Sequence, residues 1–486
     1  MKIIFQKLIA MSPILIIGFT IVILMLSISL KRNNLINFII TLFGFVTSLL
    51  SIFLLGINNY LVNISLLVKI DKFALFCSSL IIISAIASSI FGYYWLKNLG
   101  DNYYKDEFYL LITIIVLGGV LLSISDHMIS MFVGIELITL PLFGLISYDY
   151  KTNYSLEAGI KYILLSVSFS FLLFGIAFLY AESGDLSFVS IANFFSDKQI
   201  HKPLVIIGLG MLIVGFCFKL SLFPFHLWTP DIYQGSPIAV SSFLSTGNKI
   251  AVFSVLFRIF AKTSISDTEN IDILFSIIAV TSIIFGNLLA LIQKNIKRLL
   301  GYSSVTNIGY LLVALILSRN DLIISKYFII IYLISYVFSN LGIFGVINTI
   351  SNSFKTKNFD NMREFRGLFY NNPILAVIMN IMIFSLAGVP MTLGFIAKFY
   401  LIISVMYSKI FYLISIIVIG NIIGIYYYLR FVASFYVYEK KDIKMNLNFK
   451  KELLSIFFIT VCTFIIIIFG IWPQFIIDIA SMIINN

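Results

Sequence analysis

The chain has 486 residues, of which 60% are hydrophobic and 11% charged, and its mean hydropathy is +1.04. These values lie outside the range of water-soluble domains and predict an integral membrane protein. The formal net charge of +11 arises mostly from short connections between apolar runs, where Lys and Arg orient helices in a lipid bilayer. It therefore indicates contact with lipid and gives no support to nucleic-acid binding.

The first apolar run follows Lys2 and Lys7 and extends to Leu30. It is too long for the core of a signal peptide and no small-residue cleavage site follows it, so we expect it to stay attached as the first span. Similar runs continue along the chain and predict an all-α polytopic membrane protein with about 14 transmembrane helices. The expected spans are Met11–Leu30, Phe38–Leu55, Phe73–Leu96, Phe108–Ile124, Met128–Tyr148, Ala158–Ala181, Leu204–Trp228, Ile238–Phe260, Ile271–Ile292, Lys297–Leu317, Ile323–Ile350, Ile374–Met406, Phe411–Tyr436 and Leu453–Ile471.

The connections between these spans predict the orientation of the chain. An even number of spans places both chain ends on the same side of the membrane. The connections away from the ends carry about 17 Lys and Arg residues, against about 10 on the side of the ends. Since positive connections stay in the cytoplasm, we expect both termini to face outward, into the periplasm of a bacterium with this protein in its inner membrane.

Two predicted spans are irregular. Leu204–Trp228 contains Pro224, and Ile374–Met406 is too long for one untilted crossing and contains Pro390 between glycines. Each break falls in the fourth helix of a five-helix set, which predicts two inverted repeats, although two prolines can also be similarly spaced by chance. The expected divisions are a three-helix segment at 1–107, the repeats at 108–260 and 261–436, and a C-terminal helix at 437–486.

Four charged residues stand deep within apolar spans: Glu136, Lys219, Lys249 and Lys398. A charge near the bilayer centre costs at least about 2.5–3.5 kcal/mol, so such residues normally face the protein interior and serve a function. Glu136 requires a cationic partner or a proton. A buried lysine that gains and loses its proton as a carboxylate approaches or withdraws can carry protons. The alternative is a static ion pair that fixes helix packing.

Lys219 and Lys398 stand next to the two predicted breaks. A proline has no N–H, so Pro224 leaves the carbonyl of Leu220 without its helical donor, and Pro390 does the same for Leu386. Within hydrocarbon, such carbonyls need water or a polar side chain.

Four further residues are candidates for a proton relay. His226 would share a helical face with Lys219 if the helix resumes after Pro224, but it is equally well explained as an interfacial hydrogen-bonding group. Lys161 follows Glu157 at the spacing of an i,i+4 pair, which can form on a surface without any function. Tyr302 and Asn307 are polar residues in a predicted span, and we expect them to face the interior.

The sequence contains no phosphate-binding loop, dinucleotide motif or cysteine cluster, so we expect the chain to bind no cofactor. Its cysteines, Cys77, Cys217 and Cys462, lie far apart in apolar runs and show no metal-ligand spacing. The composition and the buried charges together predict a protein that moves an ion and performs no redox chemistry itself.

Several segments resemble a known family, subunit N of the proton-translocating NADH–quinone oxidoreductase, respiratory complex I. The resemblance covers nearly the whole chain, and one segment, FHLWTPDIYQGSP, is typical of the wider antiporter-like group that includes subunits L and M and the Mrp-type cation/proton antiporters. The matching segments are GIELITLPLFGL (134–145), SLEAGIKYILLS (155–166), FKLSLFPFHLWTPDIYQGSP (218–237), NIKRLLGYSSVTNIGYLLVAL (295–315), EFRGLF (364–369) and SLAGVPMTLGFIAKFY (385–400).

The resemblance implies that Glu136, Lys219, Lys249 and Lys398 lie on the family's proton path, and that Lys161 matches a lysine of its sixth helix. Asn307 stands where the family commonly has a histidine, which favours a water chain over a histidine relay there. The resemblance further implies a place in the membrane arm between subunit M and the small membrane subunits near the quinone-reducing module. NADH, flavin, iron–sulfur clusters and quinone would all be bound elsewhere in the complex.

Two other classes of function remain as alternatives. A freestanding antiporter would exchange Na⁺ or K⁺ for H⁺, but it should show an oxygen cage at mid-membrane, where this chain has lysines that repel cations. A membrane scaffold without transport would have no reason to bear the cost of burying these lysines.

Overall fold

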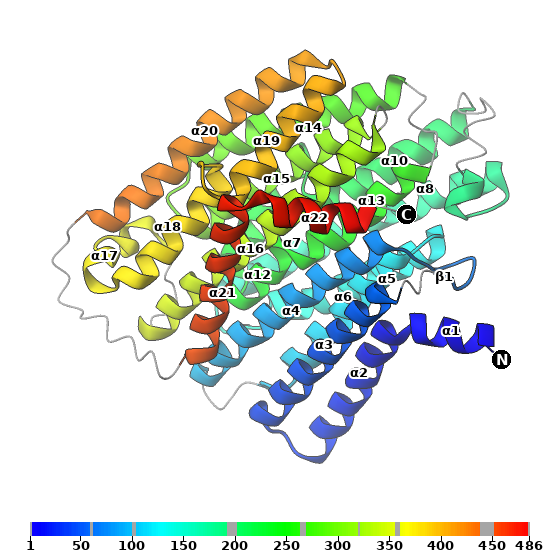
Figure 1. Ribbon diagram of the computed structural model, residues 1–486. Helices are drawn as coiled ribbons and strands as arrows, with labels where there is room; N and C mark the ends of the chain where they lie inside the picture. Colours follow the sequence, from blue (N-terminus) through cyan, green and yellow to red (C-terminus); the bar gives the residue numbers. More distant parts are fainter. Residues whose placement is uncertain are drawn as a thin grey trace. The chain divides into compact units, whose positions relative to one another are not determined.

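The computed structural model describes residues 2–58, 62–99, 104–191, 202–262, 269–318, 321–354, 360–437 and 452–484 (Figure 1). Some predictions concern residues outside these ranges, namely part of the segment 437–486 and several lysines used for the orientation, among them Lys198, Lys355, Lys357, Lys440 and Lys441.

Helices make up nearly all of the described structure. One short antiparallel hairpin, β1 (Val62–Asn63) with β2 (Lys69–Ile70), precedes α4. The helices are α1 (Lys2–Ala10), α2 (Ser12–Leu30), α3 (Asn34–Ile57), α4 (Lys72–Asn98), α5 (Glu107–Ile124), α6 (Met128–Ile146), α7 (Asn153–Ser166), α8 (Ser168–Ser183), α10 (Pro203–Leu220), α11 (Trp228–Gly235), α12 (Ile238–Ser245), α13 (Gly247–Lys262), α14 (Glu269–Ile292), α15 (Ile296–Leu317), α16 (Leu322–Phe354), η3 (Met362–Phe365), α17 (Leu368–Asn371), α18 (Pro373–Ala387), α19 (Leu393–Tyr407), α20 (Phe411–Tyr436), α21 (Leu453–Ile471) and α22 (Pro473–Ile484).

The predicted all-α polytopic fold is confirmed. In the described residues, 13 helical stretches are long and apolar enough to cross a membrane, and each corresponds to a predicted span. The remaining predicted span, Ile374–Met406, is divided into two shorter apolar helices, α18 and α19. This division is the break predicted from Pro390.

The helices group into two compact units, which we describe separately. The predicted division into inverted repeats stays a prediction. Unit 1 consists of Met1–Ser89, Asp101–Ser221 and Gly247–Leu274, and unit 2 of Ile90–Gly100, Leu222–Thr246 and Phe275–Asn486.

In unit 1, glycines allow two helix pairs to pack closely, α5 with α6 and α8 with α10. A Cβ atom on Gly118 would lie 3.0 Å from the carbonyl oxygen of Gly134, and one on Gly175 would lie 2.8 Å from the carbonyl oxygen of Gly208. Small residues at such contacts let the backbones of membrane helices approach one another. The helices that carry Glu136 and Lys219 are thereby fixed against their neighbours.

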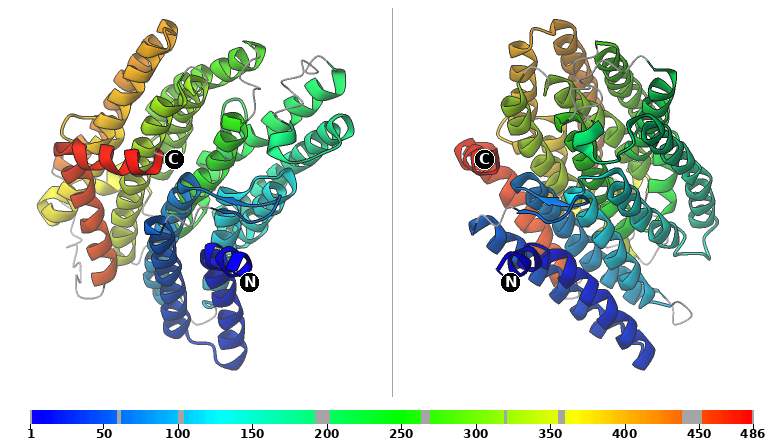
Figure 2. Two further views of the ribbon diagram at one scale, coloured as in Figure 1. Left: turned by 45° about the vertical axis from the view of Figure 1, so that its right-hand side comes forward. Right: turned by 90° about the vertical axis from the view of Figure 1, so that its right-hand side faces the viewer.

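Unit 2 is organised around α16, which contacts α12, α15, α18, α19, α21 and α22. Its neighbour α15 is buried along its whole membrane-spanning length. The C-terminal helix α22 lies across the end of α21, as the views of Figures 1 and 2 both show. The interior of this unit therefore consists of α15 and α16, with Lys398 supplied by the adjacent α19.

Besides the junction of α7 and α8 at Val167, three helix interruptions in the described residues bring polar backbone into otherwise apolar spans. Helix α10 ends at Leu220, where Ser221 takes a left-handed conformation with φ 57°. Helix α18 ends at Ala387, followed by Gly388 with φ 83°. The third interruption, at the single residue Thr246 between α12 and α13, was not predicted, because no proline or left-handed glycine marks it.

Candidate functional site

Glu136 lies in the middle of α6 but on a face that the chain itself leaves partly open. The residue is half-buried, and its helical neighbours Val133 and Leu140 are 43% and 71% exposed. The position along the helix agrees with the prediction of a deep carboxylate, whereas burial by the chain is incomplete. A carboxylate on an otherwise apolar face needs a further cover within a membrane.

Lys219 lies near the end of α10 and is buried. Its Nζ donates a hydrogen bond of 2.8 Å to Oγ1 of Thr139, which stands on α6 one turn after Glu136. The ammonium also lies 4.1 Å from the centre of the Phe169 ring and 5.4 Å from that of Tyr162, within the range of cation–π attraction. Aromatic faces and one hydroxyl thus replace water around this charge.

Glu136 and Lys219 interact through their charges without forming a direct ion pair. Each is the opposite charge that acts on the other, yet no salt bridge joins them in the described chain. Thr139 contacts the lysine in place of the carboxylate. A spaced pair of this kind can change its interaction energy by side-chain movement, which a closed salt bridge resists.

Lys249 lies in the first turn of α13, directly after the interruption at Thr246, and is 1% exposed. Its Nζ donates a hydrogen bond of 3.4 Å to the carbonyl oxygen of Lys219 and another to Oγ of Ser221. The break after α10 therefore supplies acceptors to a second lysine. Because Lys219 is also the nearby like charge, the two ammonium groups repel one another.

Lys161 forms the predicted i,i+4 pair with Glu157, at 2.7 Å between Nζ and Oε1. The side chains are 38% and 59% exposed. Ion pairs at such exposure contribute little to stability. Whether Lys161 takes part in proton transfer stays a prediction.

Lys398, in unit 2, satisfies the backbone freed by the break after α18. Its Nζ donates to the carbonyl oxygens of Leu386 at 2.8 Å and Ala387 at 3.0 Å. The sequence predicted that Pro390 frees the Leu386 carbonyl and that a polar group must compensate, and this is confirmed. Gly388 makes the contact possible, since a Cβ there would lie 2.8 Å from Cδ of the lysine.

Beside Lys398 lies a small cavity of about 10 Å³, enough for roughly one water molecule. Asn307 lines it from α15, accepting at Oδ1 a hydrogen bond of 2.8 Å from the hydroxyl of Tyr332, while its Nδ2 is buried without a hydrogen-bond partner. The cavity is lined by Asn307, Tyr332, Ser335, Tyr336, Ser385, Leu386, Gly394 and Lys398. A buried amide and an ammonium therefore face the same space.

His226 is buried in unit 2 but does not continue the helix of Lys219. Residues 221–227 are not helical, so the condition for a shared helical face is not met, and a role of His226 as a relay stays a prediction. The ring of His226 stacks on Phe223 at 5.3 Å and lies 6.1 Å from the ring of Tyr302. Neither ring nitrogen has a hydrogen-bond partner within the described chain.

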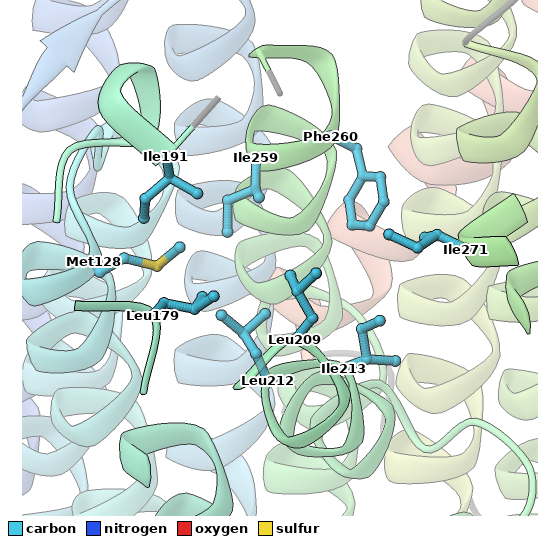
Figure 3. Close-up of a pocket in the computed structure, with 9 residues that line it drawn as sticks. All are labelled: Met128, Leu179, Ile191, Leu209, Leu212, Ile213, Ile259, Phe260 and Ile271. Atoms are coloured by element: carbon cyan, nitrogen blue, oxygen red, sulfur yellow. The ribbon is translucent and has the colours of Figure 1, made fainter. Parts of the chain in front are cut away.

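Unit 1 also contains an apolar cavity, and none of the candidate site residues lines it (Figure 3). Its nine lining side chains are all hydrophobic, and such cavities stay dry. The figure shows them pointing toward one another from α6, α8, α10, α13 and the neighbouring segments. They are Met128, Leu179, Ile191, Leu209, Leu212, Ile213, Ile259, Phe260 and Ile271. This cavity offers no proton a place to bind.

Glu136 and the three buried lysines fall within residues 125–424, which match the family model described as NADH:quinone oxidoreductase/Mrp antiporter, TM. The match covers more than half of the chain. The protein belongs to this family. It is therefore an antiporter-like membrane subunit. This agrees with the wider group that the sequence segments resemble.

Three solved structures share the antiporter-like fold over almost the whole chain. A chain of respiratory complex I from Thermus thermophilus with bound Aureothin is 26% identical, with a TM-score of 0.80, covering 96% of this chain and 98% of that one. A chain of the membrane-bound sulfane sulfur reductase, an archaeal respiratory membrane complex, is 20% identical, with a TM-score of 0.87 and coverages of 99% and 97%. A chain of the Mrp complex from Dietzia sp. DQ12-45-1b is 15% identical, with a TM-score of 0.84 and coverages of 99% and 97%. The last two show the fold alone, and all three chains belong to membrane complexes.

Sequence reasoning missed several groups that surround the lysines of this antiporter-like subunit. Thr139 and Ser221 look like ordinary hydroxyl residues of membrane helices, and Phe169 looks like one of 48 phenylalanines. The sequence does place Thr139 one turn after Glu136, which is the only signal that could have identified it. Arg258 was also missed. It is 4% exposed and donates to Asp71 at 2.8 Å and to the carbonyl of Ser125 at 2.9 Å.

Proposed function

We propose that this chain is subunit N of a bacterial proton-pumping NADH–quinone oxidoreductase and conducts protons through Glu136, Lys219, Lys249 and Lys398. The observation that carries the proposal is the position of the lysines at helix interruptions. In each unit, a buried ammonium donates to carbonyl oxygens that a broken helix leaves free. Water and amines at such breaks can exchange protons, which a continuous apolar helix does not permit.

In unit 1, the charges of Glu136, Lys219 and Lys249 would act in sequence. Two neighbouring ammonium groups repel one another, so the pair of lysines favours a single proton shared between them. A carboxylate that moves toward Lys219 stabilises the proton there, and a carboxylate that moves away releases it toward Lys249. Lys398 would then serve as the last carrier, with the Asn307 cavity holding a water next to it.

Lys161, His226 and Tyr302 are proposed only as possible relays. Lys161 is a half-exposed ion pair, so its proton can exchange with the surroundings of the chain. The rings of His226 and Tyr302 lie near one another but outside the Asn307 cavity. No step of the proposed path depends on them.

The cofactors and partners follow from the proposed place in the complex. Redox energy would come from NADH oxidation through flavin, iron–sulfur clusters and quinone bound by other subunits, and the chain itself would bind none of them. Subunit M and the small membrane subunits are the proposed neighbours. One of them would cover the open side of Glu136, because the face of α6 with Val133 and Leu140 is apolar and exposed. The chain would lie in the inner membrane with both termini in the periplasm.

A second candidate function is Na⁺ or K⁺ exchange for H⁺, which the family name and the likeness to an Mrp complex chain bring into consideration. A cation site in a broken helix needs free carbonyl oxygens. Here the ammonium of Lys398 occupies those of Leu386 and Ala387. This observation favours proton transfer.

Purification of the tagged chain from native membranes tests the proposal. We expect NADH-oxidising, quinone-reducing activity to co-purify, and NADH to acidify the lumen of inverted vesicles only when Lys219 and Lys398 are intact. A chain that purifies without this activity and exchanges Na⁺ for H⁺ in proteoliposomes would instead be a freestanding antiporter.

A further inference from the structure

Unit 2 contains a second, larger cavity on α15, α16 and α19, three of the four helices that line the Lys398 cavity. It has a volume of about 180 Å³. It lies where α15 ends, α16 begins and α19 ends, and these helices contact one another. Its lining residues are Leu317, Asp321, Ile324, Ser325, Ser404, Tyr407 and Ser408. We call it the vestibule.

The vestibule has both polar and apolar lining residues, and two of them, Asp321 and Tyr407, are exposed. The carboxylate of Asp321 is exposed and caps α16, accepting hydrogen bonds from the backbone N–H groups of Ile323 at 2.9 Å and Ile324 at 3.1 Å. Tyr407 is 72% exposed. Ser325, Ser404 and Ser408 also line the vestibule, and the first two are buried. A negative charge at the mouth of a polar cavity raises the local concentration of protons and cations.

One apolar layer stands between the vestibule and the Lys398 cavity. On α16, Phe328 lies between Ser325 of the vestibule and Tyr332 of the inner cavity, with its ring 5.1 Å from that of Tyr332. On α19, Leu401 lies three residues after Lys398 and three before Ser404. Residues three and four apart share a helix face, so both side chains fall between the cavities. Phe328 and Leu401 are each 0% exposed.

The third helix continues the same layer. On α15, Ala314 lies between Asn307 of the inner cavity and Leu317 of the vestibule, and it is 0% exposed. The seven helical steps from Ser325 to Tyr332 span roughly 10 Å of helix. The apolar layer is therefore about two helix turns thick.

We propose that the vestibule is the water-filled outlet for a proton leaving Lys398, and that Ala314, Phe328 and Leu401 form the dry plug that closes it. The inference rests on the proposed function and adds the outlet and its barrier. Release breaks an N–H bond of the Lys398 ammonium, leaves a neutral amine, and forms an O–H bond on a water that has entered the plug. The proton then passes to bulk water through the hydroxyls and the carboxylate of the vestibule.

Thiol labelling tests the vestibule. In assembled complexes whose native Cys77, Cys217 and Cys462 have been replaced by alanine, Ser404→Cys is expected to react with a membrane-impermeant cationic methanethiosulfonate added on the side of the chain ends. Val405→Cys is the matched control, because Val405 is the next residue, is 0% exposed and lines neither cavity. An unreactive Ser404→Cys, or equal reaction at both positions, overturns the proposal.

Passive proton leakage tests the plug. In proteoliposomes without NADH, a trapped pH dye should report several-fold faster equilibration after a pH jump with Phe328→Ala than with the unmodified complex. Phe344→Ala is the control, because Phe344 lies on the same helix, is also 0% exposed and lines neither cavity. Leakage that is equal in the two variants overturns the plug. Leu401→Ser, a smaller change, is expected to leak as well if Phe328→Ala fails to assemble, and it overturns the plug if it stays tight.

The outcome is distinguishable from failure of the proposed function. Labelling and passive leakage are both measured at rest, so they require no NADH-linked pumping. If the complex pumps through the lysines but shows neither labelling nor leakage, the outlet proposal is wrong and the proposed function stands. A complex that shows both, yet pumps without Lys219 and Lys398, loses the proposed carriers and keeps only the water-filled vestibule and its plug, without Lys398 as the donor.

Discussion

Nζ of Lys398 lies 2.8 Å from the carbonyl oxygen of Leu386, the group that Pro390 deprives of its helical donor. The lysine thus replaces a backbone N–H with a donor that can give its proton away. In this respect the break after α18 differs from an ordinary helix end, where Gly388 alone would satisfy the capping bonds. A single side chain both stabilises the interruption and makes it reactive.

Lys398→Glu is expected to retain more proton transport than Lys398→Ala. A protonated glutamate can donate one hydrogen bond to Leu386 or Ala387 and can still titrate, whereas alanine leaves both carbonyls without a donor. Proton flux in reconstituted complexes measures the difference. Equal flux in both variants would show that transport does not need a titratable group there.

Lys219→Ala is expected to leave assembly largely intact but to lower proton pumping and coupled quinone reduction together. The loss should be roughly 100-fold, the lower end of what a positioned proton-transfer group contributes. Alanine creates no unpaired positive charge, and Thr139 keeps its own bond to the carbonyl of Ile135 at 2.7 Å. Dye quenching in inverted vesicles reports pumping, and NADH oxidation by the same vesicles reports coupling. A normal rate and a normal proton-to-electron ratio would place Lys219 outside the path.

Glu136→Gln should impair pumping more than Glu136→Asp does. Glutamine keeps the size of the side chain but removes the charge that acts on Lys219, whereas aspartate retains it. Neither variant breaks a direct ion pair, since no salt bridge joins Glu136 to another described residue. The two variants should therefore assemble alike and differ only in pumping. If both pump at the unmodified rate, the carboxylate is a packing group.

Asn307→Leu is expected to slow pumping, because it removes the amide that faces the Lys398 cavity and leaves the Tyr332 hydroxyl without its acceptor. Asn307→His should recover much of the rate, since an imidazole restores both a hydrogen-bonding group and a titratable one. The comparison uses initial rates of vesicle acidification at equal NADH oxidation. A leucine variant as fast as the unmodified protein would exclude the Asn307 cavity from the path.

We expect the free energy of unfolding to depend on pH because of Glu452, which lies just before α21. Burial raises the pKa of its carboxyl from 4.5 to about 7, and its Oε2 has no hydrogen-bond partner in the described chain. The folded state therefore holds this proton more tightly than the unfolded state does. Its contribution to stability is full below pH 4.5 and declines as the pH rises to about 7.

Glu452→Gln should remove this decline and stabilise the chain above pH 7 by roughly 1 to 3 kcal/mol. Thermal unfolding of the detergent-solubilised protein between acidic and mildly alkaline pH measures it. Glu157→Gln is a suitable control, because Glu157 is 59% exposed and lies in a surface pair. If the two variants show the same pH profile, burial of Glu452 is not the cause.

The sequence predicts the features that are unfavourable within a membrane, because charged residues and prolines are easily recognised in an apolar run. Charged residues in apolar spans revealed Glu136 and the lysines, and Pro390 revealed the break and the carbonyl that Lys398 satisfies. The interruption at Thr246 escaped prediction because neither a proline nor a left-handed glycine marks it. Thr139 and Tyr332 escaped because hydroxyls are common in membrane helices, where most bond to their own backbone.

His226 shows a different limit of the sequence. Its spacing from Lys219 is meaningful only if helical phase persists, and Ser221 in the left-handed region ends that phase. The distance of any residue beyond a break depends on the path of the irregular backbone, which periodicity does not encode. The partly open face of Glu136 was missed for a related reason, because depth along a helix does not reveal which side of the helix is covered.

The glycine contact between α8 and α10 restricts which parts of unit 1 can move. With the carbonyl of Gly208 against Gly175, a rotation or slide of α10 would drive backbone into backbone. Because Lys219 stands on this fixed helix, movement at the site is limited to rotation of the Lys219 side chain and of the Glu136 carboxylate. Substitution of Gly175 by a bulkier residue would therefore push α10 away from α8 and displace Lys219, although residue 175 does not contact the lysine.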